Sequence, residues 1–130
     1  MRHVLFDVLF VATGGSLGAL TRYGAGLAAA HWLGKGFPWG TLAVNVAGCF
    51  VMGIVMELLQ GLEANSREAM TPTLQSQIAL WHRGLAIGFL GGLTTFSTFG
   101  GDTLRQFQSG QPTLALANIA ANVLLSFFPF

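Results

Sequence analysis

The sequence predicts an all-α membrane protein with four transmembrane helices, a broken third helix, and an antiparallel, dual-topology homodimer. Composition is the first observation: 52% of the 130 residues are hydrophobic, 8% are charged, and the mean hydropathy is +0.61. These values are unusual for a soluble domain. The second observation is a set of four apolar segments, and the third is a polar interruption inside one of them.

The four segments are expected at about 4–30, 39–60, 80–107 and 112–130, and residues 1–130 make a single transmembrane domain. Each is long enough for a hydrocarbon core of about 30 Å, which takes roughly 20 residues in a helix. A glycine-rich turn at 34–38, a polar stretch at 63–77 and a turn at 109–112 separate them. Tryptophans lie near the expected ends, as they do at membrane interfaces: Trp32, Trp39 and Trp81.

Glycines recur at every fourth position in the first and third segments. They are Gly14 and Gly18 in the first, and Gly84, Gly88 and Gly92 in the third. This small-xxx-small pattern predicts helices that approach closely. Packing inside one subunit and packing across a dimer face are both open at this point.

The third segment carries the interruption, at residues 84–99. The glycine pair Gly91–Gly92 is expected to unwind the helix, and four hydroxyl side chains follow it. Backbone that leaves a helix at bilayer depth is tolerated only when it is buried in protein or lines a polar cavity. Broken membrane helices commonly form ion or substrate sites, so this break is the expected functional site.

Basic residues are divided evenly between the two sides of a four-span chain. Those on the side of the termini are Arg2, Arg67 and Arg83, and those on the other side are Arg22, Lys35 and Arg105. The positive-inside bias that normally fixes orientation is therefore missing. This balance predicts insertion in both orientations and an antiparallel pair, and a single orientation set by a partner is the alternative. Four helices also leave little room for a protected pathway, whereas two copies supply eight.

Polar side chains within the apolar segments are few, and each is costly in lipid unless it faces the bundle or a cavity. They are Arg22, Asn45, Thr94, Thr95, Ser97, Thr98, Asn118, Asn122 and Ser126. The last three lie at four-residue intervals, so they form a stripe on one helical face. The stripe has two interpretations, the lining of a pathway and hydrogen bonds that join helices.

The interior groups favour an anion over a cation. Amides, hydroxyls and a guanidinium are hydrogen-bond donors, and the carboxylates are expected at or beyond helix ends: Asp7, Glu57, Glu63, Glu68 and Asp102. Phe96 and Phe99 lie at i and i+3 on one side of the helix that restarts after the break. Aromatic edges carry partial positive charge and can contact an anion, although core packing is the commoner role of phenylalanine.

Other classes of function receive no support from the residues. The formal net charge of +1 gives no electrostatic footprint for nucleic acid, and the three histidines are too scattered to indicate a metal site. No nucleophile, base and orienting group can be assembled from these spacings, so no enzyme is expected.

Three motifs resemble the Fluc/CrcB fluoride channel family. They are GFLGGLTTFSTFG at 88–100, GGSLGALTRYG at 14–24 and WGTLAVNVAG at 39–48. Together they occur in the family's order, and the resemblance covers nearly the entire chain.

The resemblance implies an antiparallel homodimer in the bacterial inner membrane, with two fluoride pores and one structural sodium ion at the dimer centre. It assigns the sodium to the backbone carbonyls of Gly91 and Thr94 from both subunits, and the pore vestibule to Arg22. The pore positions that it implies are Phe96, Phe99, Asn45, Ser97, Thr98, Asn118, Asn122 and Ser126.

One departure from the family concerns the last helix. Family members usually continue well past the position of Ser126, whereas this chain closes with Phe-Phe-Pro-Phe at 127–130. Residues 113–130 reach about 27 Å as a helix, barely one hydrocarbon core, and Pro129 disfavours helix at the residue before it.

The expected function is a passive, fluoride-selective channel that lets fluoride leave the cytoplasm. The alternative is a small dual-topology, proton-coupled multidrug exporter, which would need a membrane-embedded glutamate in the first helix, and Asp7 is a poor substitute. A second alternative, a non-transporting membrane subunit, leaves the break near Gly91 without a purpose.

Overall fold

The computed structural model describes residues 2–65 and 71–127, and every regular element in these two ranges is a helix, as predicted. The elements are α1 (Arg2–Trp32), α2 (Trp39–Asn65), α3 (Pro72–Trp81), the π-helix η1 (His82–Leu90), α4 (Gly91–Leu93), α5 (Phe96–Gln108) and α6 (Pro112–Phe127). Within these ranges, 4–32 and 39–62 are long and apolar enough to cross a membrane, and α6 is a shorter apolar helix.

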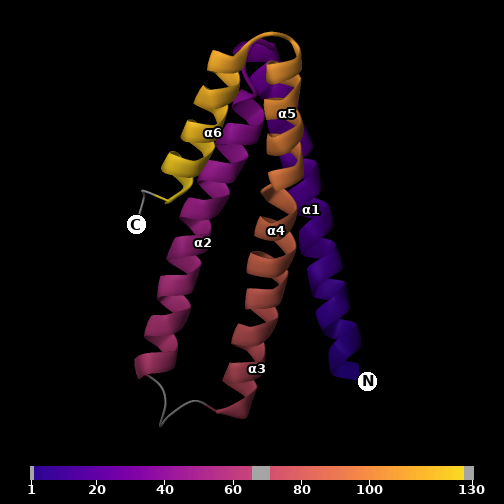
Figure 1. Ribbon diagram of the computed structural model, residues 1–130. Coiled ribbons are helices and arrows are strands. Elements are labelled where there is room, and N and C mark those ends of the chain that lie inside the picture. The colour runs from indigo at the N-terminus through magenta and orange to yellow at the C-terminus, as the bar shows by residue number, and fades with distance from the viewer. Residues whose placement is uncertain (1, 66–70, 128–130) are drawn as a thin grey trace.

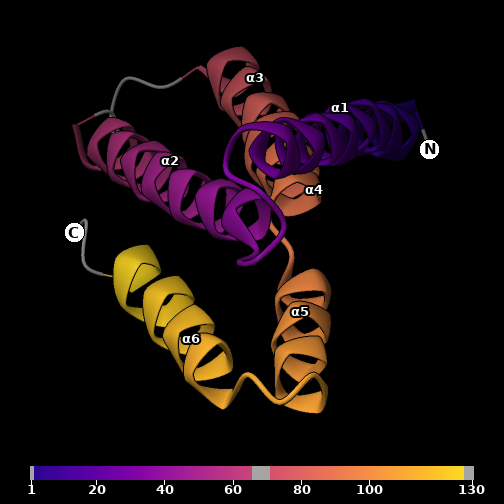
Figure 2. The ribbon, with the colours of Figure 1, turned by 90° about the horizontal axis from the view of Figure 1, so that it is seen from above.

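The helices form three long rods and one short hairpin (Figure 1). α3, η1 and α4 follow one another as a single rod, which packs along α1 and also contacts α2. α5 and α6 form the hairpin, and α6 packs against α2. Seen from above, the α5–α6 pair lies on one side of the other three rods (Figure 2). The α1–α2 and α5–α6 turns meet at the same end of the molecule, and both contain a glycine of positive φ, Gly34 at 81° and Gly110 at 74°.

The polar stretch at 63–77 is more helical than the sequence suggested. α2 continues to Asn65 and α3 begins at Pro72, where residues 63–77 were expected to separate two helices. Proline fits the first turn of a helix because its missing N–H is not needed there, and the residues that end α2 include good helix formers. At the other terminus, the expected final helix 112–130 is described to Phe127, and Pro129 lies outside the described residues.

The third segment is interrupted, but the break lies at Thr94–Thr95 and not at the glycine pair. Gly91 is helical, with φ −65° and ψ −32°, and Gly92 lies inside α4. The extended residues are Thr94 (φ −76°, ψ 152°) and Thr95 (φ −152°, ψ 117°). The prediction placed the break too early because it treated glycine as a helix breaker, whereas Gly91 and Gly92 are both helical here and Gly92 packs against Gly15 of α1.

The four-residue glycine pattern is used inside the subunit. A Cβ on Gly14 would overlap the Gly84 carbonyl, one on Gly18 would overlap the Phe89 carbonyl, and one on Gly88 would lie 2.9 Å from the Val11 carbonyl. α1 and the η1–α4 rod are therefore in backbone contact. η1 is a π-helix, a feature that the sequence did not predict.

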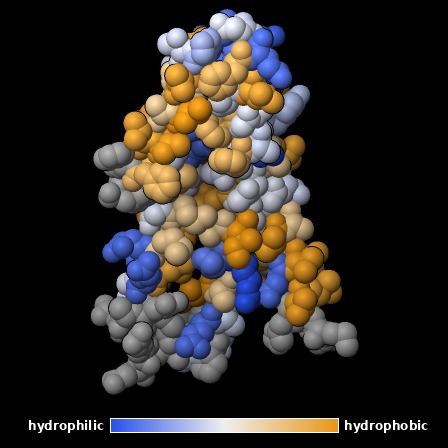
Figure 3. Space-filling view, viewed as in Figure 1, coloured by the Kyte–Doolittle hydropathy of each residue, from blue (hydrophilic) through white to orange (hydrophobic). Residues whose placement is uncertain are grey.

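The buried core is small and the apolar exterior is large. Val44, Leu90 and Leu93 form the buried cluster, while leucines, phenylalanines and valines lie exposed along the rods. Hydrophobic residues cover much of the visible surface, including the lower part of α1 (Figure 3). An exterior of this kind suits a bilayer or a partner subunit. At the lower end, Arg83 of η1 forms an ion pair with Asp7 of α1 at 2.6 Å.

Candidate functional site at the interrupted helix

The break is organised by the hydroxyl of Thr95. Thr95 is the N-cap of α5, and its Oγ1 accepts a hydrogen bond from the Thr98 N–H at 3.2 Å. The same oxygen donates to Thr98 Oγ1 at 3.1 Å and lies 3.2 Å from Ser97 Oγ. Threonine is a favoured N-cap because its side chain satisfies an N–H that has no partner in the helix. Three hydroxyls, from Thr95, Ser97 and Thr98, are thereby gathered at the start of α5.

Asn45 of α2 forms two hydrogen bonds with the backbone of Thr95. The Thr95 N–H donates to Asn45 Oδ1 at 2.8 Å, and Asn45 Nδ2 donates to the Thr95 carbonyl at 3.3 Å. Asn45 Nδ2 also donates to Asn122 Oδ1 of α6 at 2.9 Å. The structure therefore brings the predicted site residue of α2 into direct contact with the break and with α6.

The stripe on α6 continues this set of hydrogen bonds. Asn122 Nδ2 donates to Asn118 Oδ1 at 2.9 Å, and Asn118 Nδ2 donates to Thr103 Oγ1 of α5 at 2.9 Å. Asn118 and Asn122 are buried, with 0% and 5% of their surface exposed. Of the two interpretations of the stripe, the joining of helices describes these two residues. Ser126, half-buried on the same face, makes no hydrogen bond to this set among the described residues.

Two backbone carbonyls at the break are released from their helical hydrogen bonds. In a continuous helix the Thr95 N–H would donate to the Gly91 carbonyl and the Thr98 N–H to the Thr94 carbonyl. Here these N–H groups donate to Asn45 Oδ1 and to Thr95 Oγ1. Hard carbonyl oxygens of this kind are ligands suited to a small cation, so the donor set fits the sodium site that the resemblance implies.

Arg22 of α1 approaches the same place. Its Nη1 donates to the Thr94 carbonyl at 3.4 Å, and its side chain lines a cavity of about 340 Å³ together with Tyr23, Thr95 and Thr98. The wall of this cavity therefore carries the positive charge of Arg22 and several hydroxyl groups, next to the break.

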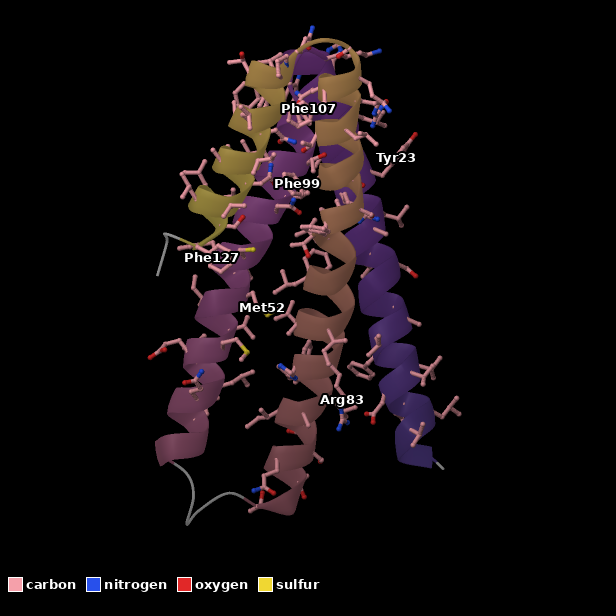
Figure 4. The ribbon with its side chains drawn as sticks, in the orientation of Figure 1. Tyr23, Met52, Arg83, Phe99, Phe107 and Phe127 are labelled. Atoms are coloured by element: carbon pink, nitrogen blue, oxygen red, sulfur yellow. The ribbon has the colours of Figure 1, made fainter. Side chains whose placement is uncertain are left out.

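Phe96 and Phe99 lie together on the first turn of α5. Their ring centroids are 5.5 Å apart with the planes tilted by 58°. Phe96 is 84% exposed, and Phe99 is half-buried and lies toward α2 (Figure 4). The pair therefore stands next to the hydroxyl cluster, and one ring lies open on the surface of this single chain.

A second cavity, of about 580 Å³, lies at the end of the molecule that holds the turns. It shares Gly26, Gly40 and Thr41 with the first cavity, and it is also lined by Lys35 and Asp102. The two chambers thus have one wall in common.

Asp102 departs from the sequence prediction. It was expected at a helix end, but it lies in the middle of α5, with 15% of its side chain exposed. Its carboxylate accepts hydrogen bonds from Thr41 Oγ1 at 2.8 Å and from Arg105 Nη2 at 2.7 Å. The prediction counted Asp102 with the last turns of the expected helix 80–107, whereas the helix that restarts after the break places it midway between Phe96 and Gln108. The carboxylate is stabilised by these donors and forms part of the cavity wall.

Sequence reasoning also missed residues that hold the site together. Thr103 accepts a hydrogen bond from Asn118, and Thr41 donates to Asp102. Gln106 lines the larger cavity, and its buried Oε1 has no hydrogen-bond partner among the described residues. Thr95 was among the polar residues selected from sequence, but its N-cap role was not predicted, although threonine is a favoured N-cap.

Replacing Thr95 by valine removes the cap hydroxyl while keeping the shape of the side chain. We expect the free energy of unfolding to fall by about 1–2 kcal/mol, because the Thr98 N–H loses its acceptor. Thermal denaturation of the detergent-solubilised protein measures the change. Thr21→Val is the matched control, since that exposed hydroxyl bonds only to its own helix at Leu17. Equal melting temperatures for the two variants would contradict the capping role.

Comparison with known proteins decides the family. The model of a family described as CrcB-like protein, Camphor Resistance (CrcB), matches residues 9–130. The chain belongs to the CrcB family. The resemblance that the three motifs indicated is thereby confirmed, and it extends across nearly all of this CrcB chain.

Several relatives of the CrcB chain are named fluoride-specific ion channel FluC. The protein from Magnetococcus marinus is 42% identical over 92% of this chain and 87% of its own length. The protein from Dehalococcoides mccartyi is 41% identical over 92% of this chain and 82% of its own. The protein from Shewanella halifaxensis is 40% identical over 94% of this chain and 88% of its own.

Proposed function

We propose that this protein is a passive, fluoride-selective ion channel that lets fluoride leave the cytoplasm and so limits its toxicity. The observation that carries the proposal is similarity along almost the whole chain to relatives named fluoride-specific ion channels. An ion channel makes and breaks no covalent bond, so the protein is not an enzyme.

The protein is proposed to be a multi-pass protein of the bacterial inner membrane with four spans. α1 and α2 have the length and hydropathy of membrane spans. The third span would be the rod of α3, η1 and α4 continued by α5, and the fourth would be α6. The exposed apolar side chains along these helices favour contact with lipid.

The functional unit is proposed to be an antiparallel homodimer. The even division of basic residues supports insertion in both orientations. Phe96 is 84% exposed in the single chain, directly beside the break, and a second copy would cover it. An aromatic side chain that belongs to a site and lies uncovered is a reason to expect a partner surface there.

A structural sodium ion is proposed at the dimer centre, held by the carbonyls of Gly91 and Thr94 from both subunits. The release of these carbonyls from helical hydrogen bonds supports the assignment. A bound cation would supply fixed positive charge that lowers the free energy of an anion nearby.

Fluoride is proposed to pass beside Phe96 and Phe99, close to the hydroxyls of Ser97 and Thr98. Fluoride is strongly hydrated, so a selective pathway must replace its water with closely placed donors. Hydroxyls and aromatic ring edges provide such contacts without the tight hold of a full charge. The remaining polar residues of the pathway are Arg22 in the vestibule and Asn45, Asn118, Asn122 and Ser126 along α2 and α6.

The exporter alternative is not favoured. A proton-coupled exporter needs a carboxylate in the membrane that can release its proton and bind substrate. Asp7, the acidic residue of α1, is paired with Arg83 at 2.6 Å, and Asp102 of α5 is held by Thr41 and Arg105. Among the described residues, no hydrogen bond joins either carboxylate to the hydroxyls of Thr95, Ser97 or Thr98.

Efflux from reconstituted vesicles tests the function. Vesicles loaded with potassium fluoride or potassium chloride receive a potassium ionophore, and an ion-selective electrode follows the released anion. We expect rapid fluoride release and chloride release near the protein-free background, without any proton gradient. Equal rates for the two anions would refute selectivity, and fluoride movement that depends on a proton gradient would refute a passive channel.

A further inference from the structure

A continuous set of side-chain hydrogen bonds begins and ends on the backbone that carries Phe96 and Phe99. The Thr95 N–H donates to Asn45, Asn45 to Asn122, Asn122 to Asn118, Asn118 to Thr103, and Thr103 Oγ1 to the Phe99 carbonyl at 2.8 Å. We call this set the asparagine relay. It passes from the break through α2 and α6 and returns to α5 one turn after the break.

The orientation of every amide in the relay follows from its first bond. A backbone N–H can only donate, so the atom of Asn45 that faces Thr95 must be Oδ1, and Nδ2 must face Asn122. The atom of Asn122 that accepts is then Oδ1, and its Nδ2 faces the carbonyl oxygens of Asn118. All the bonds therefore run in one direction, which strengthens each of them through mutual polarisation.

The relay uses nearly all the amide hydrogens that were expected to face the ion. Asn45 Nδ2 donates to the Thr95 carbonyl and to Asn122. Asn122 Nδ2 donates to the backbone and side-chain oxygens of Asn118. An amide has two N–H donors, so Asn45 and Asn122 have none left for an anion unless an existing hydrogen bond breaks.

Asn45 also replaces the hydrogen bonds that the break removes. Thr95 is extended and only 7% exposed, so its N–H and carbonyl need partners inside the protein. Asn45 supplies both, much as a neighbouring strand would. Without Asn45, the Thr95 N–H and carbonyl would both be left inside the protein without these partners, and the extended conformation would lose its support.

We infer that Asn45, Asn118 and Asn122 are positioning residues, which hold the break open and fix the segment that carries Phe96 and Phe99. The inference rests on the proposed channel function. In it, these amides hold the backbone near the pathway in place and do not bind the ion directly. Asn118, Asn122 and Thr95 are buried, so breaking any hydrogen bond of the relay would leave a polar group without a partner inside the protein. The relay therefore favours one conformation of the segment that carries Phe96 and Phe99.

Hydrogen exchange of the Thr95 amide in the full chain, reconstituted in lipid nanodiscs, tests the inference. In Asn45→Ala the N–H loses its acceptor, and we expect its exchange to be about tenfold faster than in the wild type. In Asn45→Asp one carboxyl oxygen still accepts the Thr95 N–H bond, and the carbonyl oxygens of Thr95 and Asn122 favour the protonated acid, whose O–H donates where Nδ2 did, so exchange should stay within about threefold of the wild type. The aspartate variant has the shape of asparagine and guards against misfolding of the alanine variant.

Fluoride efflux from vesicles is measured on the same variants, with Ser16→Ala as control, because the Ser16 hydroxyl bonds only within α1. We expect Asn45→Ala to lose flux together with Thr95 protection. Loss of flux with unchanged exchange would overturn the inference and make Asn45 a direct ligand, and faster exchange with full flux would overturn the positioning role. Absence of fluoride flux in the wild type would refute the channel function itself, while the exchange comparison would still decide whether Asn45 holds Thr95.

Discussion

Phe96→Ile and Phe99→Ile are each expected to reduce fluoride efflux from vesicles to background, a loss of more than about a hundredfold. Isoleucine keeps the apolar volume but lacks the positive ring edge that contacts an anion. Inside a dry pathway the anion has lost its hydration water, and contacts with the protein must replace that water. Losing the contact with a ring edge therefore raises the free energy of the anion by several kcal/mol. The two rings lie 5.5 Å apart on one helical turn, so we expect the loss of either one to suffice.

The same substitution at Phe107 is the matched control. Phe107 lies on α5 as well, further from the break, and is 45% exposed (Figure 4). Phe107→Ile should leave efflux unchanged, and size-exclusion profiles should match for all three variants. Wild-type efflux from Phe96→Ile and Phe99→Ile would remove aromatic contacts from the mechanism.

Gly18→Ala is expected to lower the free energy of unfolding by about 2–4 kcal/mol. An added Cβ would overlap the Phe89 carbonyl and lie 2.8 Å from the Leu93 backbone nitrogen. Backbone atoms cannot move aside as a side-chain end can, so α1 and the η1–α4 rod must separate. Separation also weakens the many contacts along the crossing, and small residues are favoured at membrane helix crossings for this reason.

Gly24→Ala separates this steric effect from helix propensity. Gly24 lies on the same helix, and its added Cβ would meet nothing within 4 Å. Alanine favours helix over glycine by about 0.5–1 kcal/mol, so Gly24→Ala should be neutral or stabilising. Thermal or denaturant unfolding in detergent measures both variants. If Gly18→Ala unfolds no earlier than Gly24→Ala, the two rods are not in backbone contact.

The sequence predicted the elements whose signals are local. Apolar length identified the helical segments, and α2 begins at Trp39, where the second segment was expected to start. The break was predicted a few residues early because its position depends on partners outside the segment. Gly91 and Gly92 stay helical and Gly92 packs against Gly15 of α1, whereas Thr95 is held extended by Asn45 of another helix. The π-helix His82–Leu90 left no recognisable pattern in the sequence.

The candidate site divides in the same way. Arg22, Asn45 and the hydroxyls of 94–98 could be selected from sequence because polar groups in apolar segments are rare. Their pairing could not be predicted, since Asn45, Asn118 and Thr103 are brought together only by the packing of α2, α5 and α6. The position of Asp102 in the middle of α5 was missed because the residue was counted with the last turns of the expected helix 80–107.

Glycine has two opposite purposes along α1. At Gly14 and Gly18, below the level of the break, the missing side chain brings two backbones together. At Gly26, above it, an added Cβ would meet no atom within 4 Å, and this residue lines both chambers. The middle of α1 therefore uses glycine to remove space, and its C-terminal part uses glycine to keep space open. Enlarging these residues would separate two helices at the first place and fill part of both cavities at the second.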